Sequence, residues 1–171
     1  MSKRAWIFCD GSTGPLEVHQ QSTGQSESLR NLRATFGDKM ACAAAALARN
    51  EQGQILRWAW QRLPALTNNE AEYAGLHLGL ELAHELGVQE AFLALDSEIV
   101  VGQMSGRFGV HSRQLLPWHR AACQKARRIP QVRYCAIPRE WNRLADGLAG
   151  QAGIPWYDLR GWIERGAKMT G

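Results

Sequence analysis

The sequence lacks an apolar run long enough to cross a bilayer. Its longest run, MACAAAALA from Met40, has 9 residues, whereas a membrane-spanning helix needs about 20. The N-terminal MSKRAWIFCDGS places basic residues before an apolar stretch, but that stretch is too short for a signal peptide and leads directly to a charged residue. We therefore expect a cytoplasmic protein with no membrane partner.

Cysteine is scarce and its spacing does not suit a metal site. The four cysteines form no C-x-x-C pair and have no histidine at ligand spacing. We expect them to be buried free thiols, which excludes a disulfide scaffold and a zinc site. A chain of 171 residues, 45% of them hydrophobic, can bury a core without such support. One domain is therefore expected.

Lysine and arginine are absent from residues 68–100, which carry 7 acidic residues. Residues 101–143 reverse this balance, with 9 basic residues and one acid, and the whole chain has a net charge of +4. The two blocks are either complementary solvated faces or a basic surface for a polyanion beside a carboxylate cluster for a cation. Composition leaves both interpretations open.

Apolar segments alternate with turn signals along most of the chain. The pattern predicts strands over residues 4–9, 40–49, 54–61, 91–95 and 132–137, and helices over residues 67–87, 97–104, 111–128 and 142–152. Strands followed by alternating helices and strands predict an α/β fold, a mixed sheet covered by helices. The polar residues 13–39 are expected to form a long loop.

Three local features of these elements carry specific expectations. Residues 40–49 are rich in alanine, which favours a helix, but the turn signal at residues 50–53 favours a strand in a hairpin. An asparagine pair, Asn68 and Asn69, can cap the helix over residues 67–87, and Gly87 is placed to end it. Asp10 is expected at the end of the first strand.

One glutamate of the 67–87 helix falls on its apolar side. On a helical wheel of 100° per residue, the residues within about 60° of Glu72 are Gly75, Leu76, Gly79, Ala83 and Leu86. Glu70 falls on the opposite side, where its charge meets water. A buried carboxylate is costly unless it is paired, hydrogen-bonded or bound to a cation. The alternative is that Glu72 is an ordinary glutamate near the end of the helix whose carboxylate reaches solvent.

Three aspartates also stand at the ends of predicted elements. Asp10 and Asp96 follow apolar strands, and Asp146 lies in the first turn of the last helix. Singly, such residues form turns or interact with helix dipoles. If these three aspartates converge with Glu72, their repulsion requires cations, and hard carboxylate oxygens select Mg²⁺ or Mn²⁺. Two such ions would support attack of water on a phosphodiester.

These acids stand in four motifs: DGS at Asp10, TNNEAEY with Glu72, LDSEIVV with Asp96 and REWNRLADGLA with Asp146. Four motifs in this order resemble type 1 ribonuclease H. Residues 106–113 are too short for a basic handle on the substrate, so the chain resembles the handle-less subgroup. The resemblance implies a ribonuclease H-like mixed five-stranded sheet flanked by helices over residues 1–152, with an insertion at about 13–39 and a tail at 153–171.

The resemblance also implies an activity. It is that of an endoribonuclease which hydrolyses the RNA strand of RNA–DNA hybrids and leaves 5′-phosphate and 3′-hydroxyl ends. By the same resemblance, two Mg²⁺ or Mn²⁺ ions are cofactors. Asp10 bridges both ions, Asp146 holds the ion that activates water, and Glu72 and Asp96 hold the other.

Contacts to the nucleic acid are implied in the same way. Asn68 and Asn69 match a pair that approaches the minor groove, where 2′-hydroxyls are displayed. The alternative is a purely structural role as helix caps, and both roles can coexist. Arg139 stands where many members have a histidine, and its alternative is a surface ion pair with Glu140. The remaining expected contacts are Gly11, Ser12, Ser97 and Asn142, with Arg107, Arg113, Arg127 and Arg128 as candidates for phosphate.

Several alternatives remain open at this stage. A handle-less member can also act on double-stranded RNA, and the same fold serves exonucleases, strand-transfer enzymes and non-catalytic nucleic-acid-binding modules. The acids can also be surface features of a purely structural α/β protein. In the tail, Trp156, Tyr157 and Trp162 either pack on the domain or form a partner surface. No protein partner can be inferred from the sequence.

Overall fold

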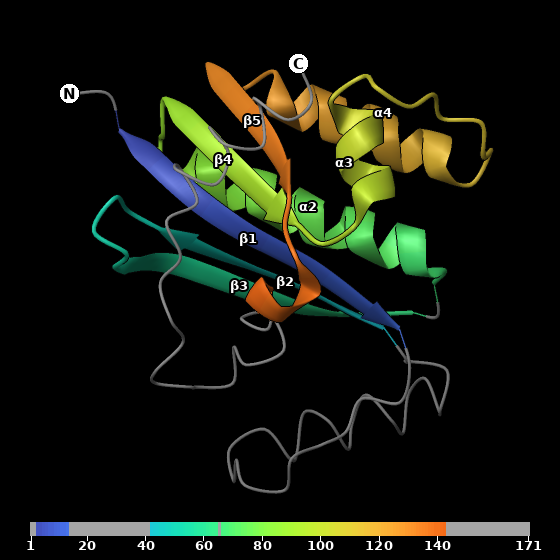
Figure 1. Ribbon diagram of the computed structural model, residues 1–171, viewed down its shortest axis with the longest axis horizontal. Helices are drawn as coiled ribbons and strands as arrows, with labels where there is room; N and C mark the ends of the chain where they lie inside the picture. The colour runs from blue at the N-terminus through green and yellow to red at the C-terminus, as the bar shows by residue number, and fades with distance from the viewer. Residues whose placement is uncertain (1–2, 14–41, 65, 143–171) are drawn as a thin grey trace, which may run out of the picture.

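The computed structural model describes residues 3–13, 42–64 and 66–142, with residues 12, 13 and 62 described as backbone only. A five-stranded sheet with the order β3-β2-β1-β4-β5 dominates these residues (Figure 1). The central strand β1 runs antiparallel to β2 and parallel to β4. The strands are β1 (Arg4–Thr13), β2 (Cys42–Arg49), β3 (Ile55–Leu63), β4 (Glu90–Leu95) and β5 (Gln131–Ala136). The predicted mixed sheet is confirmed.

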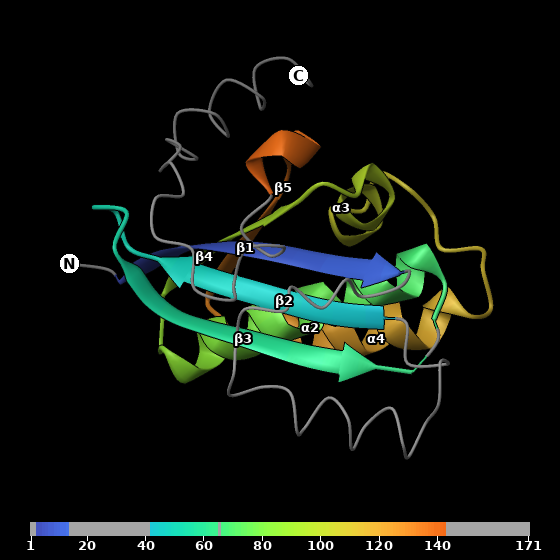
Figure 2. The same cartoon turned by 90° about the horizontal axis from the view of Figure 1, so that it is seen from below.

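Among the described residues, three α-helices accompany the sheet: α2 (Asn68–Glu85), α3 (Glu98–Met104) and α4 (Leu115–Ala126). Figure 2 shows α2 and α4 on the same side of the sheet. A 3-10 turn, η2 (Arg139–Trp141), follows β5. Of the helices in the described part of the chain, none has the length and apolarity to span a bilayer. The predicted helix beyond residue 142, most of the insertion and the tail lie outside the described residues.

The alanine-rich segment is a strand despite its helical propensity. All of its side chains are buried, and it pairs with β1 on one side and β3 on the other. The turn that follows enforces this pairing, because the Asn50 side chain accepts hydrogen bonds from the backbone N–H groups of Gln52 and Gln54. Gly53 supplies a positive φ of 78°. Tertiary pairing and turn chemistry therefore outweigh propensity here.

The start of α2 is capped by a residue other than the predicted asparagines. Thr67 is the N-cap: its side chain accepts from the backbone N–H of Glu70, and the Glu70 carboxylate accepts from the backbone N–H of Thr67. This reciprocal capping box satisfies two otherwise unpaired donors. The predicted cap was therefore wrong by one residue, and Asn68 and Asn69 are the first two helical residues. Gly87, at φ 61°, ends the helix as predicted.

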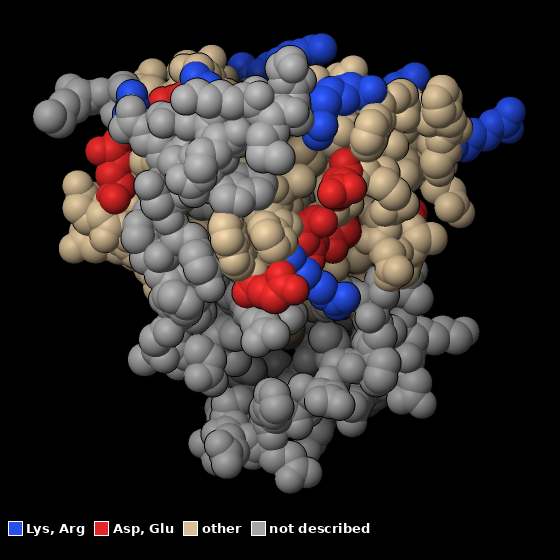
Figure 3. Space-filling model, in the orientation of Figure 1, with Lys and Arg blue, Asp and Glu red and all other residues tan. Residues whose placement is uncertain are grey.

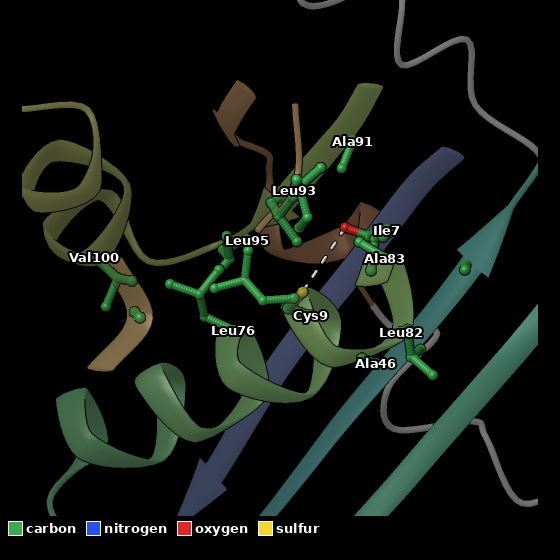
Figure 4. Close-up of a cluster of buried hydrophobic side chains, with 14 of the residues drawn as sticks. Ile7, Cys9, Ala46, Leu76, Leu82, Ala83, Ala91, Leu93, Leu95 and Val100 are labelled. Carbon is green, nitrogen blue, oxygen red and sulfur yellow. Dashed lines mark hydrogen bonds between the residues drawn. The ribbon is translucent and has the colours of Figure 1, made fainter. Parts of the chain in front are cut away.

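The apolar core between α2 and the sheet sets the position of the helix. Side chains of β1 at odd positions, Ile7 and Cys9, pack with Leu76 of α2 and Leu93 of β4 (Figure 4). Side chains at even positions point to the other face, where the rings of Trp6 and Phe92 stack at 5.0 Å. Alternation along β1 therefore supports an apolar cluster on each face of the sheet.

Most predicted boundaries within the described residues differ from the structure by one or two residues, and two differ by four. β1 continues through Thr13, so Asp10 lies within the strand and not at its end. The reason is that β2 pairs with β1 as far as the Thr13–Cys42 pair. The helix predicted from residue 111 starts at Leu115. The ten residues between α3 and α4 leave no room for a long basic handle.

Candidate metal centre

The backbones of β1 and α2 touch, and glycine permits this contact. A Cβ at Gly11 would lie 1.8 Å from the carbonyl oxygen of Ala71, and one at Gly75 would lie 2.3 Å from the carbonyl oxygen of Asp10. No side chain fits such spaces, so both positions require glycine. The contact places Glu72, which lies one residue after Ala71, beside Asp10. Gly11 thus has a packing role, and its contact with nucleic acid stays a prediction.

Three of the four candidate acids meet at this contact. Asp10, Glu72 and Asp96 each offer a carboxylate oxygen, and these oxygens all lie within 4.8 Å of one another. Asp10 comes from β1, Glu72 from the second turn of α2, and Asp96 from the residue after β4. Acidic side chains also gather near the middle of the face shown in Figure 3, with a basic side chain beside them. All three residues are partly accessible to solvent.

The environment of Glu72 opposes its negative charge. Burial, the charges of Asp10 and Asp96 and a hydrogen bond with Asp96 raise the pKa of Glu72 to about 9. The charge of Arg139 acts in the opposite direction but does not compensate. Glu72 Oε2 is buried and has no hydrogen-bond partner among the described residues. A carboxylate held in this way needs a proton or a cation from solution.

The helical wheel placed Glu72 on the side of α2 that faces the sheet, and the structure agrees. Gly75, Leu76, Gly79 and Ala83, which it grouped with Glu72, are all buried against the sheet. Glu70 lies on the other side of the helix, but it does more than face water. Its carboxylate accepts hydrogen bonds from Thr67 and Trp118, and those bonds lower its pKa.

Trp118 makes contacts with α2 that the sequence did not reveal. It binds Glu70 through its side chain, and its carbonyl oxygen lies 2.9 Å from His77 Nε2. The His77 and Trp118 rings also meet edge to face at 5.6 Å. These contacts attach α4 to the part of α2 that carries Glu72. Trp118 belongs to the predicted 111–128 helix, but its sequence position gave no sign of this contact.

Asn142 fastens the chain after η2 to the strand that carries Asp10. Its side chain is 2% exposed, and its Nδ2 donates a hydrogen bond of 2.8 Å to the carbonyl oxygen of Cys9. This contact gives Asn142 a structural role, and its predicted contact with nucleic acid stays a prediction.

Burial and the charges of Glu72 and Asp10 raise the pKa of Cys9. Its thiol therefore stays neutral.

Other predicted contact residues surround the acids. Asn68 and Asn69 lie four and three residues before Glu72, on its side of the helix. Ser97 caps α3 by accepting from the backbone N–H of Val100 at 3.2 Å. Arg139 is exposed, and its charge acts on Glu72. This observation favours the interpretation of Arg139 as part of the site.

The remaining predicted residues divide into two groups. Asp146 and the side chain of Ser12 lie outside the described residues, so the structure brings together three of the four predicted acids. The four candidate phosphate contacts are all exposed: Arg107, Arg113, Arg127 and Arg128. Of these, Arg128 lies 2.5 Å from His84 Nε2 and Arg107 lies over the Phe108 ring. Their binding roles stay predictions.

Comparison with known proteins identifies the family. The family model described as "Reverse transcriptase-like" matches residues 31–152. The chain is 39% identical over 102 residues to the bifunctional protein Rv2228c of Mycobacterium tuberculosis, covering 60% of this chain and 28% of that protein. It is 31% identical over 86 residues to ribonuclease HI of Halobacterium salinarum, covering 50% of this chain and 43% of the relative. The chain thus spans less than half the length of either relative.

A solved structure agrees with this assignment. The N-terminal RNase H domain of Rv2228c, determined as a fusion with maltose-binding protein, superposes with a TM-score of 0.67 and 28% identity. The match covers 85% of this chain and 95% of that chain. Together with the mixed sheet and the family model, this similarity supports the resemblance drawn from the four acidic motifs. The chain belongs to the reverse transcriptase-like family and has the ribonuclease H fold.

Proposed function

We propose that this protein is an endoribonuclease that hydrolyses the RNA strand of RNA–DNA hybrids. The observation that carries the proposal is the convergence of Asp10, Glu72 and Asp96, whose oxygens lie within 4.8 Å of one another. The names of two relatives, an RNase H domain and a ribonuclease HI, support the same activity. The hybrid substrate follows from the family resemblance and from the asparagines beside the acids.

The three carboxylates fit a divalent cation. Their oxygens are hard ligands, which suit Mg²⁺ and Mn²⁺ better than zinc. The buried, unpartnered Oε2 of Glu72 and the raised pKa of that residue indicate a missing positive charge. We propose that Asp10, Glu72 and Asp96 hold Mg²⁺ or Mn²⁺, and that Asp146 completes a site for two ions.

The bound ions would activate water for in-line attack on the phosphodiester and stabilise the leaving oxygen. The protein supplies the positioning. The contact of Gly11 with α2 holds Asp10 and Glu72 together, and the hydrogen bond from Asn142 fixes the strand beside Asp10. Attack in this geometry would leave a 5′-phosphate and a 3′-hydroxyl.

Recognition of RNA is assigned to the start of α2. Asn68 and Asn69 lie on the Glu72 side of the helix, where their amides can bind the 2′-hydroxyls displayed in a minor groove. A hybrid and double-stranded RNA both display such hydroxyls. Because the α3–α4 connection is short, double-stranded RNA is the second candidate substrate.

The test is cleavage of internally labelled, end-blocked substrates. Hybrid, double-stranded RNA and single-stranded RNA are each incubated with Mg²⁺, Mn²⁺ or EDTA. We expect ion-dependent cutting of the hybrid's RNA strand, and an Asp10→Asn variant should lose about 10² to 10³-fold in rate, as is typical when one electrostatic group is removed. Glu85→Gln, an exposed acid at the other end of α2, is the matched control.

Each other outcome assigns a different function. Preferential cutting of double-stranded RNA would identify double-stranded RNA, the second candidate, as the substrate. Failure on end-blocked substrates with activity on free ends would indicate an exonuclease. Binding of the hybrid without cutting under any ion would contradict the proposal in favour of a non-catalytic module.

A further inference from the structure

The strand at one edge of the sheet carries an unusual concentration of exposed apolar side chains. Among the described residues, six large hydrophobic side chains are exposed, and four of them lie on β3: Ile55 at 54%, Leu56 at 38%, Trp58 at 56% and Trp60 at 41%. Trp58 and Trp60 alternate along the regularly paired part of the strand and so share one face of the sheet, whereas Leu56 falls at an irregularity in the pairing with β2. Scattered exposed hydrophobics are ordinary, but a contiguous stripe indicates an interaction surface.

The backbone of β3 is also suited to pairing. β3 has β2 as its only partner strand in the described sheet and forms its free side (Figure 1). It is nine residues long and contains no proline. Natural edge strands are usually short, charged or interrupted, because a long apolar edge is a template for another strand. β3 lacks the first of these protections: it is long, and the irregularity in its pairing with β2 lies near its start, between Ile55 and Arg57.

We propose that β3 pairs antiparallel with β3 of a second copy, so that two sheets join across a two-fold axis. The midpoint of Ile55–Leu63 is Ala59, and pairing centred there places residues 57–61, which pair regularly with β2, opposite residues 61–57 of the other copy. Each residue of one copy then faces the residue of the other copy that lies the same number of positions from Ala59 in the opposite direction along the chain. The surface is self-complementary, as a two-fold interface requires.

This register matches the side chains as well as the backbones. Trp58 of each copy faces Trp60 of the other, which gives two cross-strand aromatic pairs on one face of the joined sheet. Ile55 faces Leu63. Arg57 faces the neutral Gln61 of the other copy, so the two Arg57 side chains do not lie opposite each other.

A second copy fits this surface better than a nucleic acid does. Bases can stack on exposed tryptophans, but such platforms also need free cations for the backbone phosphates. Arg57, on β3, is 3.1 Å from Glu85 and points to the face opposite the tryptophans. Its charge is therefore matched within the protein, and the described side chains of β3 offer a phosphate no other cation.

The first test is the mass of the full chain in solution at increasing concentration. The wild-type mass should rise from that of one 19.1 kDa chain toward twice that value between about 1 and 100 μM, the range of moderate dissociation constants. Trp58→Lys should weaken association about 30-fold, the effect expected of removing a central aromatic contact. Ile99→Lys, at a similarly exposed side chain on α3 (46%), should leave association unchanged. Circular dichroism verifies that each variant is folded.

The second test fixes the register with disulfides, in a Cys123→Ser background because Cys123 is the one cysteine that is not buried. With the two-fold axis at residue 59, cysteines in Ala59→Cys face each other with Cα atoms about 5 Å apart, within disulfide range. In Gln61→Cys the cysteines are four residues apart along the strands, about 13 Å. Mild oxidation should cross-link the first variant and not the second.

Three results would overturn the proposal. One is a wild-type chain that stays monomeric throughout the concentration range. Another is a dimer that survives Trp58→Lys, or that cross-links through residue 61 and not residue 59. The third is a monomer whose nucleic-acid binding is lost in Trp58→Lys, which would assign the stripe to base stacking.

Discussion

Two carboxylates at opposite ends of the parallel strands are held in contrasting ways. Glu90 begins β4, is 9% exposed, and forms ion pairs with Arg4 at 2.9 Å and Arg133 at 3.0 Å. Glu72, near the other end of β4, has two acids as its close neighbours. The first acid is neutralised by arginines from the two flanking strands. Around Glu72, the negative charge of the acids exceeds the positive charge that the described residues supply.

This difference separates a structural acid from a functional one. A buried charge persists only when an opposite charge or hydrogen bonds compensate it. At Glu90 the chain supplies that compensation itself. At Glu72 the raised pKa and the unpartnered Oε2 show that the described protein does not. We infer that the compensation at Glu72 comes from a bound cation, which is the basis of the proposed activity.

The largest expected effect comes from breaking the contact that assembles the acidic end. In Gly75→Ala, the new Cβ would lie 2.3 Å from the Asp10 carbonyl oxygen, so α2 must move away from β1. We expect a loss of about 3 kcal/mol in the free energy of unfolding, together with weaker binding of Mn²⁺. Chemical denaturation and Mn²⁺ titration measure the two effects. Unchanged values for both would show that the close contact does not hold the site.

A smaller effect is expected at the arginine-paired end. Glu90→Gln leaves Arg4 and Arg133 without their counter-charge, and we expect a loss of about 2 kcal/mol. Breaking a buried ion pair typically costs roughly 3–5 kcal/mol. We expect a smaller loss here because the Arg133 side chain is 51% exposed and its charge is screened by water. Denaturation should detect the loss, while Mn²⁺ affinity should stay as in the wild type. A change in Mn²⁺ affinity would mean that the two ends are not independent.

The smallest expected effect has the opposite sign. The folded protein keeps the proton of Glu72 up to about pH 9, whereas the unfolded chain releases it near the usual 4.5. Between these values the folded protein binds more protons, so this residue's contribution to stability falls as pH rises. In EDTA, Glu72→Gln should therefore be more stable than the wild type by about 1 kcal/mol or more at pH 8.

The pH dependence provides the control for that variant. At pH 5 the wild-type carboxyl is also neutral in the folded protein, so the stability advantage of Glu72→Gln should shrink. Denaturation curves at the two pH values measure this difference. An advantage that is absent at pH 8, or equal at both values, would show that Glu72 is not destabilised by its charge.

The sequence predicted the fold well because its signals were local and repeated. The turn signal at residues 50–53 predicted a strand over residues 40–49 even though alanine favoured a helix there. The wheel separated Glu72 from Glu70 because a three-turn apolar stripe leaves little ambiguity about which side is buried. Boundaries were less certain, because the end of β1 depends on pairing with β2, a long-range property.

The geometry of the site was less accessible to sequence reasoning. Gly11 and Gly75 follow Asp10 by one residue and Glu72 by three, but only the packed backbone shows that these glycines meet the opposite element. The hydrogen bond between Asn142 and Cys9 joins residues that are 133 positions apart. The contacts of Trp118 depend on how α4 packs against α2. None of these long-range contacts has a local signal.

Calorimetric titration of Mn²⁺ into the wild type, Asp10→Asn and Glu90→Gln at neutral pH tests the central claim most directly. We expect Mn²⁺ to bind the wild type and Glu90→Gln equally and to bind Asp10→Asn at least about tenfold more weakly, a difference of about 1.4 kcal/mol. Proton release should accompany binding to the wild type, because the ion displaces the proton of Glu72. Equal binding by all three proteins, or no binding by the wild type, would contradict the claim that the acidic end of the sheet is a cation site.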